Sequence, residues 1–200
     1  MSSPADTEIQ TPTSPNSIFY PPGGLLIWSL VLMELITFGI ALIAFLVSGR
    51  QEPEIYQQAR AHLNPLYGTA NTVFLLVSGY FMAIAVQHFE SGRIAQARRG
   101  VFFAMTGGGL FLVLKAVEYR EKIHAGLILG HDTFFTYYWL LTGFHLMHVL
   151  VGLVILATLA RRLRPTATPL NSEDFEAGAV FWHMCDLIWL LLFPVIYLLA

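Results

Sequence analysis

The chain has 200 residues, of which 56% are hydrophobic and 12% are charged, and its formal net charge is −2. Soluble domains carry about 25% charged residues, so this composition excludes an ordinary soluble enzyme and a disordered chain. The small net charge provides no basic surface for a nucleic acid, and none is expected as a partner. The single cysteine, Cys185, excludes an internal disulfide and a cysteine-rich metal site.

The first 23 residues are rich in proline, serine and threonine, which predicts a flexible tail. This segment lacks the basic start and apolar core of a signal peptide. A spanning helix needs about 20 mostly apolar residues. Five segments have this character, at about residues 25–47, 66–89, 101–117, 136–160 and 177–199. Residues 24–200 are therefore predicted to form an all-α integral membrane bundle of five transmembrane helices.

The loops are short, and residues 54–63 between the first two spans are expected to form a small surface helix. Lysine and arginine concentrate on the cytoplasmic side of membrane proteins. Five spans place six arginines on the side of the N-terminus, at positions 93, 98, 99, 161, 162 and 164. The opposite side has four basic residues, so the N-terminus is predicted to be cytoplasmic and the C-terminus outside.

Ionisable side chains inside a membrane are costly and mark functional candidates. Glu34 lies near the middle of the first span. It is either a proton-exchanging carboxyl or a protonated acid that hydrogen-bonds a neighbouring helix. Lys115, Glu118 and Lys122 share one helix face at the end of the third span. They are expected to be an interfacial cluster with lysines that reach toward the membrane surface, or else a site for a lipid headgroup or partner subunit.

Histidines are the third group of polar residues in the spans. His145 and His148 share a face of the fourth span, and His183 lies one turn before Asp186 in the fifth. Haem ligation needs two histidines at matching depth, and the predicted directions of these helices place His183 at a different depth. Interhelical hydrogen bonding is therefore expected of His145 and His148, and a polar pair of His183 and Asp186. The residues predict no metal site, no cofactor site and no catalytic centre in this chain.

These observations leave three classes of protein open. They are an accessory subunit of a membrane complex, a small proton-coupled transporter that uses Glu34, and a haem-binding membrane cytochrome. Broken helices at the membrane midplane, which are typical of transporters, are not evident in the sequence.

Several motifs then resemble those of subunit III of the haem–copper oxidases, in the order that this family has them. GFHLMHVLVG at 143–152 resembles G-F-H-G-x-H-V-x-x-G, with Leu146 in place of the second glycine. WHMCDLIWLLLFPVIY at 182–197 is similar to the family's terminal helix, and NTVFLLVSGYFMAIAV at 71–86 to its N-T helix. Glu34 and the Glu118–Tyr119 pair match further family positions. The chain looks like the short, five-helix bacterial form. Its brevity and overall sequence character resemble the NorE-like branch associated with nitric oxide reductase.

The resemblance implies an accessory subunit without metal or haem that binds the haem–copper catalytic subunit I in the bacterial inner membrane. Haem and copper would belong to that partner. The family implies a cleft that holds phospholipids, protection of the catalytic subunit against inactivation during turnover, and support of proton uptake. It assigns Glu34 to a protonatable position, and Glu118, His145, His148, His183 and Asp186 to cleft or packing positions.

Overall fold

The computed structural model describes residues 21–164 and 170–199, and every regular element in these ranges is helical. Most of the predicted tail, residues 1–20, lies outside the described residues. The elements are α1 (Gly24–Gln51), α2 (Pro53–Ala61), α3 (Pro65–Glu90), α4 (Ile94–His124), α5 (Thr133–Arg162), α6 (Ser172–Phe193) and the π-helical segment η1 (Pro194–Leu199). Five stretches are long and apolar enough to cross a membrane: α1, α3, α4, α5, and α6 together with η1. The all-α prediction is therefore confirmed.

The observed helices extend beyond the apolar segments from which they were predicted. The third span was expected at about 101–117, whereas α4 occupies Ile94–His124. Its added ends carry arginine, lysine, glutamate, glutamine and alanine, all of which are good helix formers. Apolar length therefore identified the apolar middle of the helix but not its polar ends. The short surface helix expected at 54–63 corresponds to α2.

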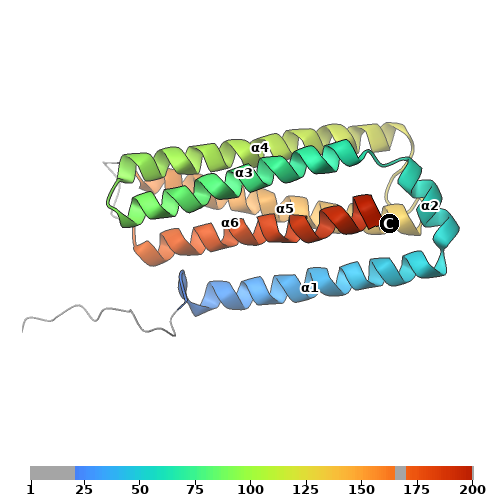
Figure 1. Cartoon of the computed structure of the whole chain (residues 1–200), viewed down its shortest axis with the longest axis horizontal. Coiled ribbons are helices and arrows are strands. Elements are labelled where there is room, and N and C mark those ends of the chain that lie inside the picture. The colour runs from blue at the N-terminus through green and yellow to red at the C-terminus, as the bar shows by residue number, and fades with distance from the viewer. Residues whose placement is uncertain (1–20, 165–169, 200) are drawn as a thin grey trace, which may run out of the picture.

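The spanning helices form an elongated bundle in which successive helices run in opposite directions (Figure 1). α6 lies in the middle and packs against α1, α3 and α5, whereas α3 and α4 pack along each other over much of their length. We call one end of the bundle the α2 end; it holds α2, the α4–α5 loop and η1. The other end, where α3 turns into α4, is the α3–α4 end.

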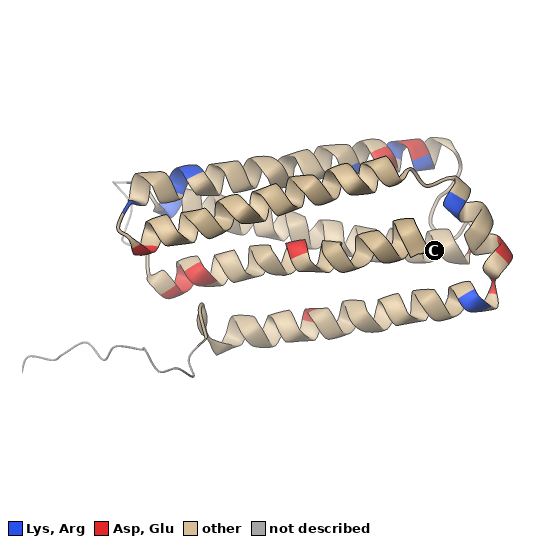
Figure 2. Ribbon diagram, viewed as in Figure 1, with Lys and Arg blue, Asp and Glu red and all other residues tan. Residues whose placement is uncertain are grey.

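Charged residues lie mainly at these two ends (Figure 2). Between the ends, α1 and α6 each carry one acidic position at mid-length, and these are Glu34 and Asp186. The outside of the bundle is covered by large apolar side chains, for example Leu32, Ile36 and Ile40 on α1, which are each more than half exposed. An apolar exterior with charged ends suits a protein whose solvent is a bilayer.

The close approach of α3 and α4 depends on small residues. A Cβ added to Gly107 would lie 2.7 Å from the Cβ of Ser78 and 2.8 Å from the carbonyl oxygen of Phe74. Ser78 also crosses this interface, because its hydroxyl donates to the carbonyl of Ala104 at 2.6 Å. Such contacts between small residues are typical of membrane helix pairs, where backbone proximity provides packing energy.

We expect Gly107→Val to destabilise the bundle by about 1–3 kcal/mol, the usual cost of overpacking. The added side chain meets backbone and a Cβ rather than a flexible side chain, so the helices must separate. Gly109→Val is the matched control, because nothing lies within 4 Å of a Cβ at that position. Thermal unfolding in detergent should show a clearly lower midpoint for Gly107→Val than for Gly109→Val, and equal midpoints would contradict this account of the interface.

Candidate functional site

The mid-membrane carboxyl of Glu34 on α1 meets His148 on α5. Glu34 Oε2 lies 3.3 Å from His148 Nε2, and the two side chains are 16% and 12% exposed. His148 Nδ1 lies 2.9 Å from the carbonyl oxygen of Phe144. A carbonyl only accepts, so Nδ1 carries a hydrogen and Nε2 faces the carboxyl. The approach lacks hydrogen-bond geometry, because Glu34 Oε2 is buried with no hydrogen-bond partner among the described residues.

Two phenylalanine rings contact His148, and they also line a small apolar groove beside this pair. The rings of Phe38 and Phe144 lie 5.7 Å and 4.7 Å from the ring of His148, measured between centroids. Phe38 and Phe144 also line a groove of about 260 Å³ between α1 and α5. The two phenylalanines therefore place apolar surface between the groove and the ring of His148.

A second polar cluster lies inside the bundle near the α2 end. Lys115 Nζ is 2.9 Å from Glu118 Oε2 and donates to the hydroxyl of Tyr197 at 2.6 Å. Tyr138 and Tyr197 each donate a hydrogen bond to Glu118 Oε1, at 2.9 Å and 2.7 Å. All four side chains are buried, Lys115 and Glu118 almost completely. We call these four residues the buried Lys–Glu cluster.

The buried Lys–Glu cluster corrects the prediction of an interfacial group at the end of the third span. Lys115 does not reach toward the membrane surface, because α5 and η1 cover it. Its ammonium lies 4.9–5.4 Å from the centroids of four aromatic rings, those of Tyr119, Tyr138, Trp189 and Tyr197. Lys122 is buried as well and donates to the carbonyl of His62. Cation–π contact and one carboxylate together replace the water that the ammonium has lost.

The π-helical segment η1 delivers Tyr197 to this cluster. Pro194 has no backbone N–H, so the regular α-helical hydrogen bond to the carbonyl four residues earlier cannot form there. From Pro194 the chain continues as a π-helix, in which each hydrogen bond spans five residues instead of four. Pro194 therefore changes the geometry of the last turn, in which Tyr197 is placed over Lys115 and Glu118.

His145 behaves differently from its expected role. It is fully buried, and neither ring nitrogen has a hydrogen-bond partner among the described residues. Its ring stacks on Trp189 at 5.4 Å and meets the edge of Phe111 at 5.6 Å, between centroids. The predicted interhelical hydrogen bond of His145 is therefore wrong, because the neighbouring helices present ring faces and edges instead of acceptors.

His183 and Asp186 form the expected close pair on α6, with 3.5 Å between Nδ1 and Oδ2. Asp186 faces α3 at Gly79, where a Cβ would collide with Oδ2. The other oxygen of Asp186, Oδ1, is buried without a partner in the part of the chain that the structure describes. His183 is 44% exposed, so the pair connects the α3–α6 interface with the outer surface of the bundle.

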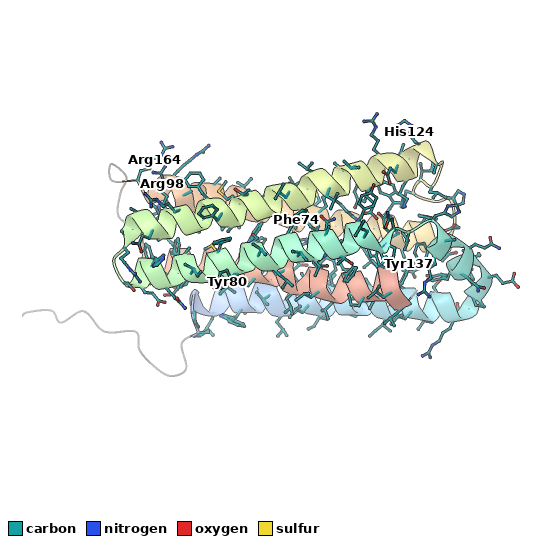
Figure 3. All side chains as sticks on the ribbon, turned by 45° about the horizontal axis from the view of Figure 1, so that its top comes forward. Phe74, Tyr80, Arg98, His124, Tyr137 and Arg164 are labelled. Atoms are coloured by element: carbon teal, nitrogen blue, oxygen red, sulfur yellow. The ribbon has the colours of Figure 1, made fainter. Side chains whose placement is uncertain are left out.

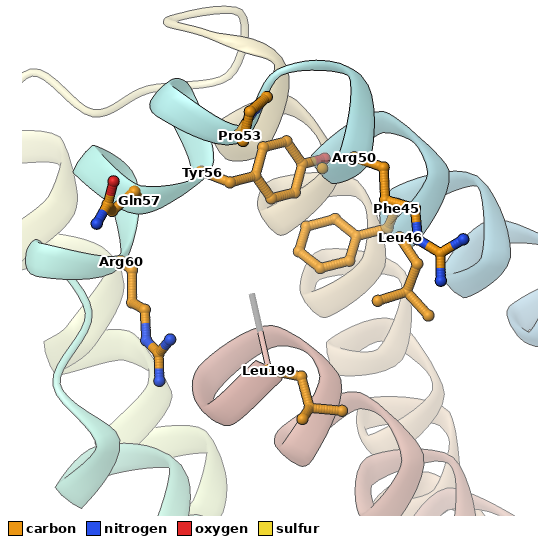
Figure 4. A pocket seen from close by; sticks show the side chains of 9 residues that line it. Phe45, Leu46, Arg50, Pro53, Tyr56, Gln57, Arg60 and Leu199 are labelled. Carbon is orange, nitrogen blue, oxygen red and sulfur yellow. The ribbon is translucent and has the colours of Figure 1, made fainter.

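A pocket of about 340 Å³ opens at the α2 end (Figure 4). Phe45 and Leu46 of α1, Tyr56 and Arg60 of α2, and Leu199 of η1 contribute to its wall. Arg60 donates to the carbonyl of Leu198 at 2.9 Å, which fastens α2 to the end of the chain's last helical turn. Burial raises the pKa of the Tyr56 hydroxyl above its ordinary value.

Within residues 21–164 and 170–199, no three His, Cys, Asp or Glu side chains gather as metal ligands would. Comparison with known proteins then identifies the family. The family model for cytochrome c oxidase subunit III matches residues 33–200. This chain belongs to the cytochrome c oxidase subunit III family.

Cytochrome c oxidase subunit 3 of Heterololigo bleekeri is 33% identical over 141 residues, which cover 68% of this chain and 53% of the relative. That of Corynebacterium diphtheriae is 29% identical over 143 residues, covering 71% of this chain and 70% of the relative. The probable subunit 3 of Nocardia farcinica is 26% identical over 175 residues, covering 87% and 85%. The chain thus spans about half the length of the Heterololigo bleekeri relative and most of the other two.

Family membership confirms the resemblance drawn from the ordered motifs. The motif residues have different surroundings in the bundle: His148 meets Glu34, His145 packs on rings, and Asp186 faces Gly79. Their roles in lipid binding or proton transfer stay predictions.

Sequence reasoning missed several residues of these sites. It did not predict that Tyr138 and Tyr197 contact Glu118. It also did not single out Asn71, which is fully buried with both side-chain polar atoms unpartnered among the described residues. It also missed two hydrogen bonds that join α6 to α3, from Trp182 to Ser78 and from Trp189 to Thr72. A usable signal existed for the aromatic residues, because a tyrosine or tryptophan inside a span generally finds a hydrogen-bond partner.

Proposed function

We propose that this chain is an accessory membrane subunit of a haem–copper respiratory complex. The family match over residues 33–200 carries the proposal. The absence of a catalytic centre was predicted from the sequence, and the subunit would instead stabilise a partner that contains haem and copper. The partner would pass electrons from cytochrome c or quinol to oxygen or, for the NorE-like branch, to nitric oxide.

Within this proposal, Glu34 is the residue that supports proton movement. The carboxyl lies 3.3 Å from Nε2 of His148, so a small movement of either side chain would make a hydrogen bond along which a proton can pass. A membrane site that holds one proton in either of two positions suits a group that buffers or relays protons near a partner. The buried Lys–Glu cluster, by contrast, joins α4 to α5 and η1 and supports the architecture of the bundle.

Deletion of this chain tests the proposal. The strain without it should assemble a catalytic subunit that starts at a normal rate and loses activity sooner during continuous turnover. Oxygen and nitric oxide consumption by washed membranes should be followed side by side, because the affected reaction identifies the acceptor. Unaltered time courses for both gases would contradict the proposed role, and proton flux by the chain alone in liposomes would favour a transporter.

We further propose that the α3–α4 end is cytoplasmic, in a bacterial inner membrane, with the α2 end outside. Two single-cysteine probes test this orientation: Ser91→Cys in the α3–α4 turn and His131→Cys in the α4–α5 loop. A membrane-impermeant maleimide added to intact spheroplasts should label His131→Cys and leave Ser91→Cys unlabelled until the membrane is opened. Cys185 is buried and should not react with the maleimide in either variant. The reverse labelling pattern would show that the orientation is inverted.

A further inference from the structure

Five arginines gather at the α3–α4 end, and none of them has an ion-pair partner among the described residues. Three belong to the first turns of α4 and the turn before it, and two to the last turn of α5 and the residues just after it: Arg93, Arg98, Arg99, Arg161 and Arg164. Their neighbour Arg162 differs, because it pairs with Asp174 of α6 at 3.1 Å. Figure 3 shows Arg98 and Arg164 at the same corner of the molecule, far from His124 at the α2 end.

Two cavities open among these arginines. One of about 850 Å³ is lined by Arg93, Arg98 and Arg99, and one of about 190 Å³ by Arg98, Arg161 and Arg164. Arg98 and Phe102 line both cavities, which are therefore parts of one groove. We call it the arginine groove.

The described residues leave the positive charge of the arginine groove uncompensated. No acidic residue lines either cavity. Asp174 contacts Arg162 instead, and Glu176 accepts hydrogen bonds from the Gly23 amide and the Ser172 hydroxyl. The buried Nε of Arg98 has no hydrogen-bond partner in the part of the chain that the structure describes. The groove therefore suits an occupant that carries carboxylates or other anionic groups.

The polypeptide that precedes α1 leaves the bundle at this same end (Figure 1). The Gly23 amide donates to Glu176 of α6 at 3.0 Å, and a Cβ on Gly23 would lie 2.7 Å from the backbone of Ala177. On the other side of α6, a Cβ on Gly178 would lie 2.6 Å from Leu159 of α5. Only α6 therefore separates Gly23 from the last turns of α5, which corresponds to two interhelical distances or about 20 Å.

The sequence before Pro21 is complementary to the groove in charge and sufficient in length. Residues 1–20 contain Asp6 and Glu8 and no lysine or arginine. About 13 residues lead from Glu8 to Pro21. A random coil of that length has a root-mean-square span of about 20 Å, and a fully extended chain reaches about 43 Å. Both carboxylates are thus within reach of the groove.

We propose that residues 1–20 dock in the arginine groove of the same chain, with the carboxylates of Asp6 and Glu8 on its guanidinium groups. Carboxylates bind guanidinium groups with paired, charge-assisted hydrogen bonds. Each exposed ion pair is weak, but the covalent tether gives the segment an effective concentration in the millimolar range. The contact is therefore reversible and sensitive to salt. It makes ionic strength a control on how much of the cationic surface at the α3–α4 end is open to other anions.

The test measures the distance between this segment and the groove by double electron–electron resonance, with the full chain in nanodiscs of phosphatidylcholine. Spin labels are attached at Ile9→Cys and at Gln96→Cys; Gln96 is exposed and lines the groove, whereas Cys185 is buried and should not be labelled. A short-distance population is expected at about 0.1 M salt. It should shrink about fivefold or more at about 1 M salt, where the screening length falls from about 10 Å to about 3 Å.

Charge substitutions on both sides make the test specific. Asp6→Asn/Glu8→Gln should shrink the short-distance population about fivefold or more, because both ion pairs are lost. Arg161→Glu/Arg164→Glu should have the same effect, and both arginines are exposed, so the fold should tolerate the change. Asp6→Lys/Glu8→Lys combined with these two glutamates should restore the short distance.

Arg50→Glu/Arg120→Glu is the matched control, because it reverses two charges at the α2 end and should leave the distances unaltered. Helical content and thermal midpoint are compared first, so that a folding defect is not read as lost docking. A distance distribution that responds neither to salt nor to the charge reversals would overturn the proposal.

A minor share of phosphatidylglycerol in the discs distinguishes a second occupant. Retention of this lipid, together with distances that no substitution changes, would assign the groove to the lipid and contradict docking. Because the chain is measured without partners, failure here leaves the accessory-subunit proposal intact, and the reverse also holds.

Discussion

Lys115→Met should destabilise the bundle by about 3–5 kcal/mol, the usual result of removing one partner of a buried ion pair. The substitution keeps the length of the side chain but leaves the carboxylate of Glu118 buried with two tyrosine hydroxyls. Thermal unfolding of the purified chain in detergent, together with its abundance in membranes, measures the effect. Both should fall markedly.

A double-mutant cycle separates the ion pair from simple packing. Lys115→Met combined with Glu118→Gln removes both charges and keeps an acceptor for the hydroxyls of Tyr138 and Tyr197. The double variant should therefore be more stable than Lys115→Met alone. Losses that simply add would indicate that Lys115 and Glu118 act independently, contrary to their 2.9 Å contact.

The exposed pair of Arg162 and Asp174 provides a matched control for this cycle. Its atoms lie 3.1 Å apart, but its side chains are 39% and 53% exposed. Exposed pairs contribute about 0–1 kcal/mol because water and salt screen them. Arg162→Met should therefore cost far less than Lys115→Met, and comparable losses would contradict the central position that we assign to the buried Lys–Glu cluster.

The second large effect is expected at Glu34. Glu34→Gln should leave assembly of the complex largely intact, because an amide of the same size still fills the space between α1 and α5. The amide cannot exchange a proton with His148, so activity should be lost several-fold sooner during continuous turnover. The measurement follows the decay of oxidase activity in washed membranes at constant substrate supply.

Glu54→Gln serves as the control for Glu34→Gln, because Glu54 is an exposed carboxyl on α2. It removes the same charge from the surface and should leave the turnover lifetime unaltered. If Glu34→Gln has the lifetime of the natural chain at equal assembly, the carboxyl has no role in turnover. If assembly itself fails, Glu34 is a packing residue and the relay proposal is wrong.

The architecture was predictable from the sequence because a bilayer imposes a simple rule. A span must be apolar over about 20 residues, and that rule alone locates all five spanning helices. Helix ends were less predictable. The polar residues that flank the third apolar segment continue α4 as regular helix, so a hydropathy boundary was not a structural boundary.

Which side chains contact one another inside the bundle could not be predicted from one sequence. The i, i+3 pair of Lys115 and Glu118 follows from helix geometry. Its burial depends on Tyr197, which is 79 residues from Glu118 in the chain and is positioned by the segment after Pro194. Glu34 was recognisable as an unusual acid, but its pairing with His148 requires α1 to lie beside α5.

His145 is a case in which a contact predicted from the sequence is absent from the structure. A buried histidine suggests a hydrogen bond, since an unsatisfied polar group in an apolar interior is costly. The side chains opposite it are the rings of Phe111 and Trp189, which come from α4 and α6. Spacing on α5 gave no information about these neighbours.

Purification of the full chain from its native membranes in a mild detergent tests the central claim most directly. An affinity tag on this chain should recover a haem–copper catalytic subunit in a fixed ratio, and the visible spectrum of the complex should contain haem. The chain washed free of that partner should have no haem absorption of its own. Recovery of the chain alone from intact membranes, or a haem spectrum that stays with the isolated chain, would contradict the account.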